Sequence, residues 1–428
     1  MKHLPVLACS LFLMNGNAQS WQQLGAQGVG GVADIVEYDG ELYITGDFEE
    51  IGGVTVNNIA RWDGAAWAPV GTGLTSWGYG SCMAVYNGEL YVAGYFDTAG
   101  GVNTYRLARW NGSTWSNVQN GLDMLLLAND MLVIGNVLYI GGSPDAACNT
   151  PLVNMVQWNG TAFSTLGTGE LEYQASTILK GTVYALAEHQ GALYVAGLFD
   201  DVDGLACEGL LRWEGGAWHA GPPGLPMSFN IDVAFIGGAL TCAQNSDQVM
   251  QWNGSVWTDF TSGWPGTGST SAMIEYNGVP VIAGHYNAGP YALNPNWGLV
   301  GAIAGSPGIS ELRIIGNDLF AVGDQGVVVN GFVERRTLVV KWSGPLDVRE
   351  QAMLPVGIHP NPATDRLYLD LAPDASRNIR ILDMTGRTVQ GWVMDRDGQV
   401  DVSALPAGMY ALQVRDVDRM GGGRFVKE

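Results

Sequence analysis

Three acidic residues, Asp200, Asp201 and Asp203, have a side-chain type and spacing that fit cation binding. Carboxylate oxygens are the ligands that Ca²⁺ prefers. No segment matches a complete calcium-binding loop, so solvated acids of a surface loop remain the favoured interpretation. Calcium is the one cofactor for which the sequence offers a candidate site.

Four aromatic residues fall between the repeated segments described below: Trp77, Tyr79, Tyr173 and Trp264. Aromatic rings in such places can stack on sugar rings or hold a protein partner. Packing between repeats is the competing interpretation. We take these four as candidate ligand-binding residues.

The candidates for catalysis are few. The repeated region holds three histidines, His189, His219 and His285, and no G-x-S-x-G motif. His285-Tyr286 is the one pair of a type that binds copper, and no second pair accompanies it. We assign no catalytic residue, and an enzyme remains the alternative interpretation.

Two markers recur along the chain and position these candidates. The first is a short apolar strand that appears as ELYITG from Glu41, ELYVAG from Glu89 and ALYVAG from Ala192, with four other copies. The second is typified by ARWNGSTW from Ala108. Asn-Gly between apolar runs indicates a hairpin, because both residues tolerate positive φ.

The markers predict seven repeats, from Trp62 to Trp342, with an average spacing under 47 residues. Each repeat indicates four short strands, and this period is typical of β-propeller blades. The seventh repeat lacks its last strand, which we expect residues 21–25 to supply. Such closure would remove exposed edges.

The repeats resemble those of kelch-type propellers, and the resemblance covers roughly residues 21–344. It implies a fold and no single activity. In such a blade, the connections after the second and fourth strands are long and lie on one face, which we call the long-loop face. Long loops on a rigid scaffold often carry function.

Residues 356–428 lack both markers. They contain the start PNPATD, the turn DMTGR, the strand LPAGMYALQV and the basic end RFVKE. This order of motifs closely resembles the type A sorting domain of the type IX secretion system, a family of the Bacteroidetes. The resemblance implies a small Ig-like β-sandwich that directs passage across the outer membrane and is then cleaved off.

The first eighteen residues have a basic start, an apolar core and small residues before Gln19, as a signal peptide does. We therefore expect residues 1–18 to be a signal peptide, 19–344 a seven-bladed propeller, 345–355 a linker and 356–428 the sorting domain. Four cysteines follow the signal peptide. Cys148 and Cys207 fall in loops on the same face of consecutive blades and could form a disulfide.

The net charge of −21 disfavours nucleic acid as a partner. After residue 18, no apolar run is long enough to span a membrane. The fold class is therefore all-β, a seven-bladed propeller followed by a sandwich. We expect a secreted or outer-membrane surface protein that passes through the periplasm and has the type IX secretion machinery as a partner.

Two functions remain open from the sequence. The first is binding or adhesion through a glycan or protein ligand on the long-loop face. The second is an extracellular enzyme acting on polysaccharide, which two or more carboxylates or histidines at the central channel would favour. The sequence identifies neither the ligand nor the oligomeric state, nor whether the exported protein is released or anchored to lipopolysaccharide.

Overall fold

The structure is a computed structural model of the 428-residue chain. It describes residues 21–428 except for a set of short segments: 76–77, 119–125, 145–153, 169, 174–180, 227–228, 246–247, 262–267, 287–289, 294–296, 301–302, 304–305, 330–331, 344–357, 370–377, 383–387, 393–398 and 416–419. The expected signal peptide, residues 1–18, and the expected linker lie outside the described residues.

The chain forms two compact units, which meet in sequence between Val348 and Arg349. All regular structure in the described residues is β-strand. The fold is therefore all-β, as the sequence predicts.

The first unit contains five sheets of four strands each. They are β2 (Gly31–Tyr38), β3 (Glu41–Asp47), β6 (Ile59–Trp62) and β7 (Trp67–Pro69); β8 (Tyr79–Tyr86), β9 (Glu89–Tyr95), β12 (Leu107–Trp110) and β13 (Trp115–Asn117); β14 (Leu126–Ile134), β15 (Val137–Pro144), β16 (Met155–Trp158) and β17 (Phe163–Thr165); β19 (Thr182–His189), β20 (Ala192–Leu198), β23 (Leu210–Glu214) and β24 (Ala217–Ala220); and β25 (Asn230–Ile236), β26 (Ala239–Gln244), β27 (Val249–Trp252) and β28 (Trp257–Asp259).

A further sheet has eight strands. One half is β29 (Gly268–Tyr276), β30 (Val279–Tyr286), β31 (Tyr291–Leu293) and β32 (Trp297–Leu299), and the other half is β33 (Ser306–Ile315), β34 (Asp318–Val329), β35 (Phe332–Ser343) and β1 (Gln22–Gln23). The pair His285↔Gly308 joins the two halves. Each half therefore repeats the four-stranded pattern of the other sheets.

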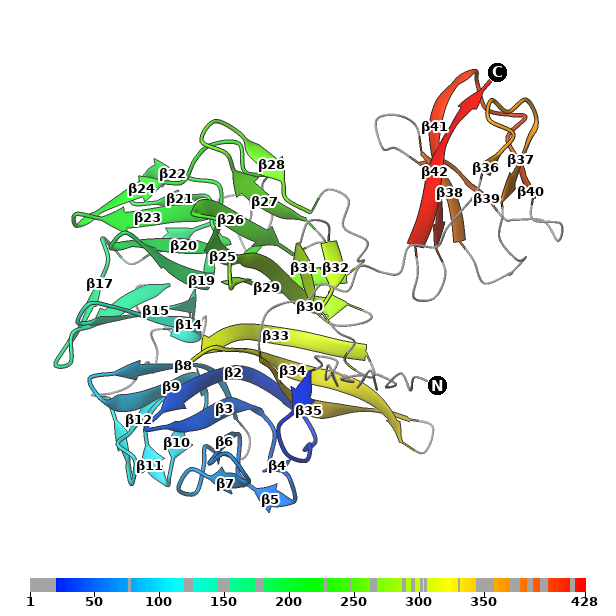
Figure 1. The fold of residues 1–428 in the computed structure, drawn as a ribbon. Helices are drawn as coiled ribbons and strands as arrows, with labels where there is room; N and C mark the ends of the chain where they lie inside the picture. Colours follow the sequence, from blue (N-terminus) through cyan, green and yellow to red (C-terminus); the bar gives the residue numbers. More distant parts are fainter. Residues whose placement is uncertain are drawn as a thin grey trace, which may run out of the picture. The chain divides into compact units, whose positions relative to one another are not determined.

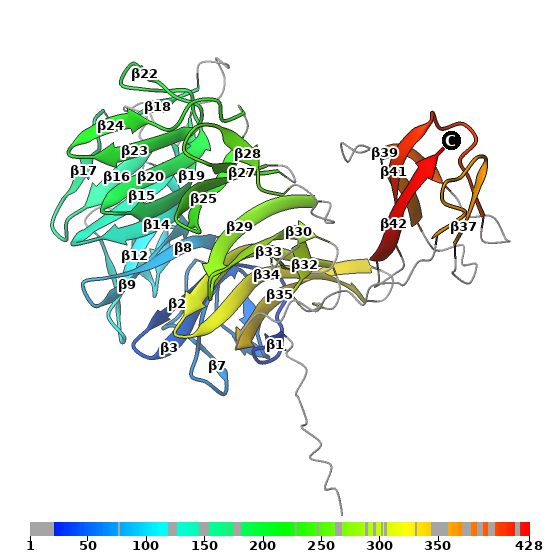
Figure 2. The same cartoon turned by 45° about the horizontal axis from the view of Figure 1, so that its top comes forward.

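The first strands of the five four-stranded sheets and of the two halves of the eight-stranded sheet contact one another in a closed cycle. The cycle runs β2, β8, β14, β19, β25, β29, β33 and back to β2. These seven inner strands surround a common axis, with the later strands of each sheet toward the perimeter (Figure 1; Figure 2 shows the same sheets after a turn of 45°). This arrangement is the radial stacking of a β-propeller.

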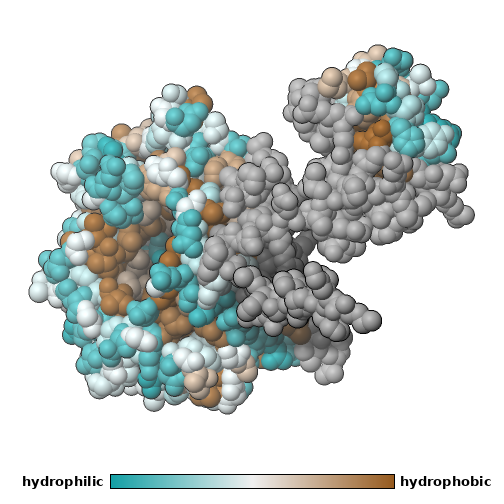
Figure 3. All heavy atoms as spheres, in the orientation of Figure 1, coloured by the Kyte–Doolittle hydropathy of each residue, from teal (hydrophilic) through white to brown (hydrophobic). Residues whose placement is uncertain are grey.

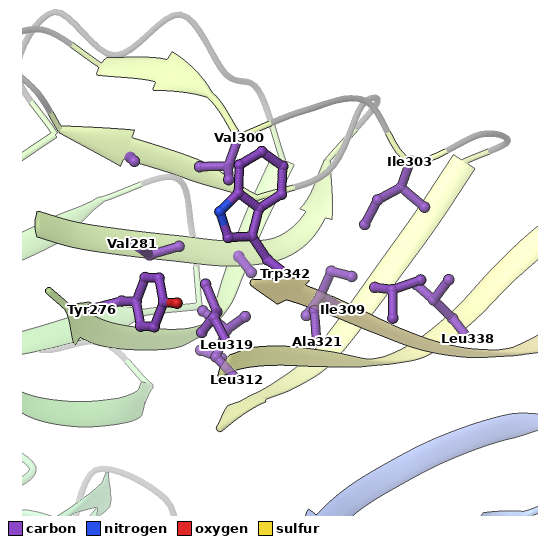
Figure 4. Packing of buried hydrophobic residues seen from close by; sticks show 14 residues of the cluster. Tyr276, Val281, Val300, Ile303, Ile309, Leu312, Leu319, Ala321, Leu338 and Trp342 are labelled. Atoms are coloured by element: carbon purple, nitrogen blue, oxygen red, sulfur yellow. The ribbon is translucent and has the colours of Figure 1, made fainter. Parts of the chain in front are cut away.

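Apolar side chains between successive sheets hold the stack together. One buried cluster joins β29 and β30 to β33, β34 and β35, and includes Tyr276, Ile309 and Trp342 (Figure 4). Equivalent clusters lie between each of the remaining pairs of neighbours around the cycle. Each sheet therefore buries both faces, which an isolated four-stranded sheet could not do.

The repeated tryptophans pack within and between the sheets. In the second sheet, Trp110 and Trp115 face each other across β12 and β13, with ring centroids 5.2 Å apart. The Trp115 indole also donates a 2.9 Å hydrogen bond to the Val70 carbonyl of the preceding sheet. Trp67, Trp218 and Trp257 donate equivalent bonds to the carbonyls of Leu24, Leu166 and Pro222.

The expected closure by the start of the chain is confirmed. Gln22 and Gln23 of β1 pair antiparallel with Lys341 and Val340 of β35. Trp21 lies against Trp342, with ring centroids 5.7 Å apart, and its indole donates to the Val300 carbonyl. The last sheet is thus completed by residues from the beginning of the described chain.

Three of the long connections fold into short hairpins, each with positive φ at the two residues of its turn. Their strands are β4 (Glu50–Ile51) and β5 (Val54–Thr55), β10 (Thr98–Ala99) and β11 (Val102–Asn103), and β21 (Asp201–Val202) and β22 (Leu205–Ala206), with β18 (Leu171–Glu172) beside β21. Asp203 takes φ 52° where the first two turns have Gly52 and Gly100.

The second unit contains two sheets. Their strands are β36 (Ile358–His359), β37 (Arg366–Leu369) and β40 (Gln399–Asp401) in one, and β38 (Asn378–Leu382), β39 (Thr388–Trp392), β41 (Gly408–Arg415) and β42 (Met420–Lys427) in the other. Leu367, Val400, Ile379, Leu412 and Phe425 from both sheets share one buried cluster. This unit therefore has a core of its own.

Candidate functional site

The structure corrects the position expected for Tyr79, which is the first residue of the inner strand β8 rather than part of a connection. Tyr79 pairs with Tyr95, the last residue of β9. Their rings stack with centroids 6.0 Å apart and 29° between the planes. Tyr79 is 45% exposed and Tyr95 50%, so the two rings form an open aromatic surface at one end of the sheet.

Arg106 extends this aromatic surface. Its guanidinium carbon lies 5.6 Å from the centroid of the Tyr95 ring, within the range of a cation–π contact. Tyr105 and Arg106 both have positive φ, 50° and 71°, where the first sheet has Asn57 and Asn58. Asn tolerates this conformation better than Tyr or Arg, so the second sheet holds two large side chains at a sterically unfavourable position.

A charged group lies at the corresponding end of the neighbouring sheets. Arg335 of β35 contacts Asp47 of β3 at 3.0 Å and Asp324 of β34 at 2.7 Å. The Gly31 backbone also donates a 2.7 Å bond to Asp47. A Cβ at Gly31 would stand 2.5 Å from the Arg335 guanidinium, so a side chain there would make Arg335 shift.

His285 completes the group. A Cβ at Gly308 would lie 2.7 Å from the His285 ring and 3.3 Å from an Asp324 carboxylate oxygen. The absence of a side chain at Gly308 therefore leaves room for the imidazole ring. His285 is exposed.

Four of these side chains occupy equivalent positions in the repeats. Each directly follows the first marker, the short apolar strand: Asp47, Tyr95, His285 and Asp324. Strands β3 and β8, which carry the charged and aromatic parts, are in contact. The inner strands begin at this end, which is the long-loop face. We call the following set the rim site: Asp47, Tyr79, Tyr95, Arg106, His285, Asp324 and Arg335.

Tyr173 and the three aspartates lie near one another. Tyr173 directly follows β18, and the Glu172 carbonyl accepts a 2.8 Å bond from the Asp200 backbone. The Asp203 carboxylate accepts from the backbone and hydroxyl of Thr168. Asp201 accepts from the Gly204 backbone. The Asp201 carboxylate thus stabilises the turn between β21 and β22, and the Asp203 carboxylate connects this turn to Thr168.

Calcium binding at Asp200, Asp201 and Asp203 gains no support. Within the described residues, no group of three or more His, Cys, Asp or Glu side chains could hold a metal ion. Calcium therefore stays a prediction of the sequence alone.

Two candidate ligand-binding residues, Trp77 and Trp264, lie outside the described residues, as does Cys148. Cys207 is a buried free thiol, and burial raises its pKa to about 12. The disulfide between Cys148 and Cys207 stays a prediction.

The structure also brings together four carboxylates that the sequence analysis did not single out. They are the axial carboxylates, on four of the seven inner strands: Asp34, Asp130, Asp232 and Glu311. Each follows a break in strand pairing, at which one extra residue is accommodated. Such a bulge redirects the next side chain.

Three axial carboxylates tie neighbouring inner strands together. One oxygen of Asp34 accepts from the next backbone N–H, and the other accepts a 2.7 Å bond from Met83 of β8. Asp130 binds Leu186 of β19 in the same way, and Asp232 binds Met273 of β29.

Arg313 of β33 is the cation of this region. Its guanidinium lies 3.3 Å from Asp34 and 3.7 Å from Glu311. The charge of Glu311, followed by that of Asp34, raises the pKa of Arg313. The Arg313 and Glu311 side chains keep 35% and 31% of their surface exposed, and that of Asp34 keeps 3%. The first two are thus surrounded by protein without being sealed from solvent.

Burial raises the pKa of three of these acids. It is the largest cause in each case and brings Asp130 to about 6, Asp232 to about 7 and Glu311 to about 8. Arg313 lowers the pKa of all three, whereas the other acids raise it. These side chains therefore interact across the axis although they come from different sheets.

Both sets leave a signal in the sequence. Each axial carboxylate precedes the first leucine of the strand marker by eight residues: Leu42, Leu138, Leu240 and Leu319. Asp47, Tyr95, His285 and Asp324 stand directly after the glycine of the same marker. Variation at a fixed place in an otherwise uniform repeat is the signal that could have found them.

Comparison with known proteins supports the two-part organisation. Residues 357–428 match the family described as "Secretion system C-terminal sorting domain". Residues 39–62 and 87–112 match the family described as "Domain of unknown function (DUF5122) beta-propeller". The chain therefore contains propeller repeats and a sorting domain, and this domain implies export to the cell surface or secretion. No protein among the curated sequences matches the chain.

One of the similar solved structures supports the fold, and it supports nothing beyond the fold. The extracellular domain of a protein from B. thetaiotaomicron, described as a one-component system, is 10% identical, with a TM-score of 0.50. The match covers 94% of this chain and 54% of that one, so the chain spans about half of its length. PorZ of Porphyromonas gingivalis, described as a surface component of the type IX secretion system, is 12% identical, with a TM-score of 0.39 and coverage of 93% and 66%. The WD40 propeller domain of Doa1 is 12% identical, with a TM-score of 0.47 and coverage of 76% and 98%.

The described residues contain no helix that is both long and apolar enough to cross a membrane.

Proposed function

We propose that this chain is a binding or adhesion protein that the type IX secretion machinery delivers to the outer-membrane surface or the medium. The match of residues 357–428 to a sorting domain carries the export part of this proposal. The separate core of that unit supports its action as an independent signal. Residues 1–18 would act first, as a signal peptide for the inner membrane.

The exported cargo is a seven-bladed propeller of residues 19–344, similar to kelch-type repeats. The closed cycle of inner strands supports this number of blades, with the eight-stranded sheet counted as two. The sorting domain is a small Ig-like sandwich, which its two sheets around one core support. Residues 345–355 link the two domains.

Ligand binding is proposed for the rim site on the long-loop face. Its support is the exposure of Tyr79 and Tyr95, together with three charged side chains at the same end of neighbouring sheets. Large exposed aromatic side chains in one place mark interaction sites more often than single exposed apolar residues do. The ligand is a glycan or a protein.

An enzyme acting on polysaccharide is the second candidate, and the axial carboxylates favour it. A carboxyl group that keeps its proton near neutral pH, as Glu311 with a pKa of about 8 does, can act as a general acid. Against this, the other three axial carboxylates already accept two hydrogen bonds each. Hydrolysis of a polysaccharide by the wild type, abolished in Glu311→Gln, would establish the enzyme.

The export proposal is tested by truncation after residue 355 in a host with the type IX system. The truncated chain should fold and remain in the periplasm, while the full chain reaches the surface or medium. Cell fractions and medium are compared by immunoblot. Normal amounts of the truncated chain at the surface or in the medium would refute the sorting role.

A further inference from the structure

The aromatic surface of the rim site is confined to one sheet. At the position of Tyr79, the other inner strands carry residues of several kinds: Gly31, Leu127, Thr182, Phe229, Ser269 and Gly308. Only the second sheet combines this ring with a second tyrosine, Tyr95, on the paired strand. The nearby Tyr105 adds a third ring, 38% exposed. Phe229 forms a separate pair with Tyr184, with ring centroids 6.4 Å apart, so the second sheet differs in carrying its exposed rings next to strand β3, which holds a charged part of the rim site.

These rings are held in place before any ligand arrives. Tyr79 and Tyr95 stack on each other, and Arg106 lies over Tyr95. Tyrosine has few rotatable bonds, and stacking restricts them further, so binding would cost little side-chain entropy. A surface that is rigid and about half exposed suits a flat, rigid ligand.

The adjacent charged part of the rim site offers many hydrogen-bonding groups. Asp47 and Asp324 contribute carboxylate oxygens, Arg335 contributes N–H donors, and His285 contributes an imidazole. Asp47 is 48% exposed and Arg335 56%, so both can reach a ligand while remaining paired. The two carboxylates and the two arginines balance in charge, so this site has no strong preference for an ion.

We propose that the rim site binds a neutral polysaccharide, an inference that rests on the proposed binding function and specifies its ligand. A pyranose ring has an apolar C–H face that stacks on tyrosine and a periphery of hydroxyl groups that donate and accept hydrogen bonds. The rim site carries both kinds of group, on strands β3 and β8, which are in contact. Acidic polymers are disfavoured, because the chain carries a net charge of −21.

The experiment is affinity electrophoresis of the full chain at pH 7 through gels containing a neutral β-glucan, a xylan, a mannan or the acidic polymer alginate. At least one neutral polysaccharide should retard the wild type, and alginate should not. Tyr79→Ala should weaken that binding about tenfold or more, since it removes a ring that can stack on the sugar. Tyr95→Ala is a second variant of the same surface and should also weaken binding, because it removes the ring on which Tyr79 is stacked.

Phe229→Ala is the matched control, because Phe229 holds the position of Tyr79 on another sheet and is 40% exposed. It should bind as the wild type does. Each variant is first shown to keep the wild-type melting temperature. The inference is wrong if no neutral polysaccharide is bound, if alginate binds equally, or if Tyr95→Ala and Tyr79→Ala both bind normally.

Failure of this inference and failure of the proposed function are distinguishable. A chain that reaches the surface or medium but binds none of these polysaccharides refutes the neutral-glycan ligand and leaves the export role intact. Capture of one surface protein in a manner that depends on Tyr95 would make the ligand a protein, and would also refute this inference.

Discussion

At the scale of single residues, the axial carboxylates show how burial changes ordinary acids. Asp130, Asp232 and Glu311 have pKa values of about 6, 7 and 8, against about 4 for these residue types in an unfolded chain. Near neutral pH, the folded protein therefore holds protons that the unfolded chain releases. Arg313 neutralises part of the remaining charge.

These raised pKa values make the folded protein less stable as the pH rises. A raised pKa in the folded state contributes stability that is present below the unfolded value and is lost as pH rises through the folded value. We expect the melting temperature of the full chain to fall by several degrees between pH 5 and pH 9. Circular dichroism at fixed ionic strength measures it, and a flat or rising profile would contradict the assignment.

Glu311→Gln is the informative variant for this profile. Glutamine can still accept the bond that Glu311 takes from the Leu312 backbone, but it does not titrate. The decline above pH 7 should therefore be smaller in the variant. Lys341→Met serves as the control for an altered charge, because the ion-pair partner of Lys341 is Asp318, which is not one of the axial carboxylates. The decline above pH 7 should be the same in this variant as in the wild type.

The residue scale also shows what the sequence can reveal. Tyr79 could be selected as a binding candidate because a tyrosine next to a repeat boundary stands out. Tyr95 and Asp324 do not stand out in the same way, since alternation explains each as a solvent-facing strand residue, and only a comparison of the repeats at that fixed place singles them out. Their proximity to Tyr79 or to Arg335 depends on strand pairing and on the stacking of sheets.

At the scale of elements, the repeat markers predicted most of the strands. Asn87-Gly88, for example, takes φ values of 50° and 76°, as a hairpin with this turn requires. The length of β34 and β35 could not be predicted. Each has twelve residues, and their extension carries Arg335 to the rim site. Nothing in the markers distinguishes this pair from the shorter pairs in other sheets.

The pairing of β1 with β35 leads to a prediction about closure. Deletion of residues 21–25 removes this strand, the Trp21 ring and the Leu24 carbonyl that binds Trp67. The last sheet would then expose an unpaired edge. We expect a melting temperature lower by several degrees, measured by differential scanning fluorimetry.

Gln23→Ala is the control for this deletion, because Gln23 is exposed and an alanine there keeps the backbone pairing. Its melting temperature should be close to that of the wild type. A deletion variant as stable as the wild type would mean that the first strand contributes nothing to closure.

At the scale of the whole molecule, the chain combines two units, one with propeller repeats and one that matches a sorting domain. Composition and motif order identified both, because each unit has its own repeated or ordered motifs and its own core. The ligand could not be predicted from the sequence, because propeller repeats specify a scaffold and leave the rim residues free to vary.

Export makes a prediction for the mature protein. If the sorting domain is removed after passage, the surface or secreted form should lack residues 356–428 and end within residues 346–354. Intact-mass spectrometry of the protein from the surface fraction or medium would measure this as the loss of one C-terminal fragment. Recovery of the uncleaved chain from that fraction would contradict it.

The hydrogen bonds of the axial carboxylates have a consequence because the number of inner strands in the cycle is odd. Inner strands with an axial carboxylate alternate with inner strands that lack one. The axial carboxylates of β2, β14 and β25 each accept a hydrogen bond from the next strand in the cycle. A cycle with an odd number of strands cannot alternate completely. Two strands that each have an axial carboxylate, β33 and β2, are therefore neighbours. Arg313 stands at this mismatch, between Glu311 and Asp34. In this ring the energetic unit is a pair of strands, and the half-buried Arg313 compensates for the strand left over.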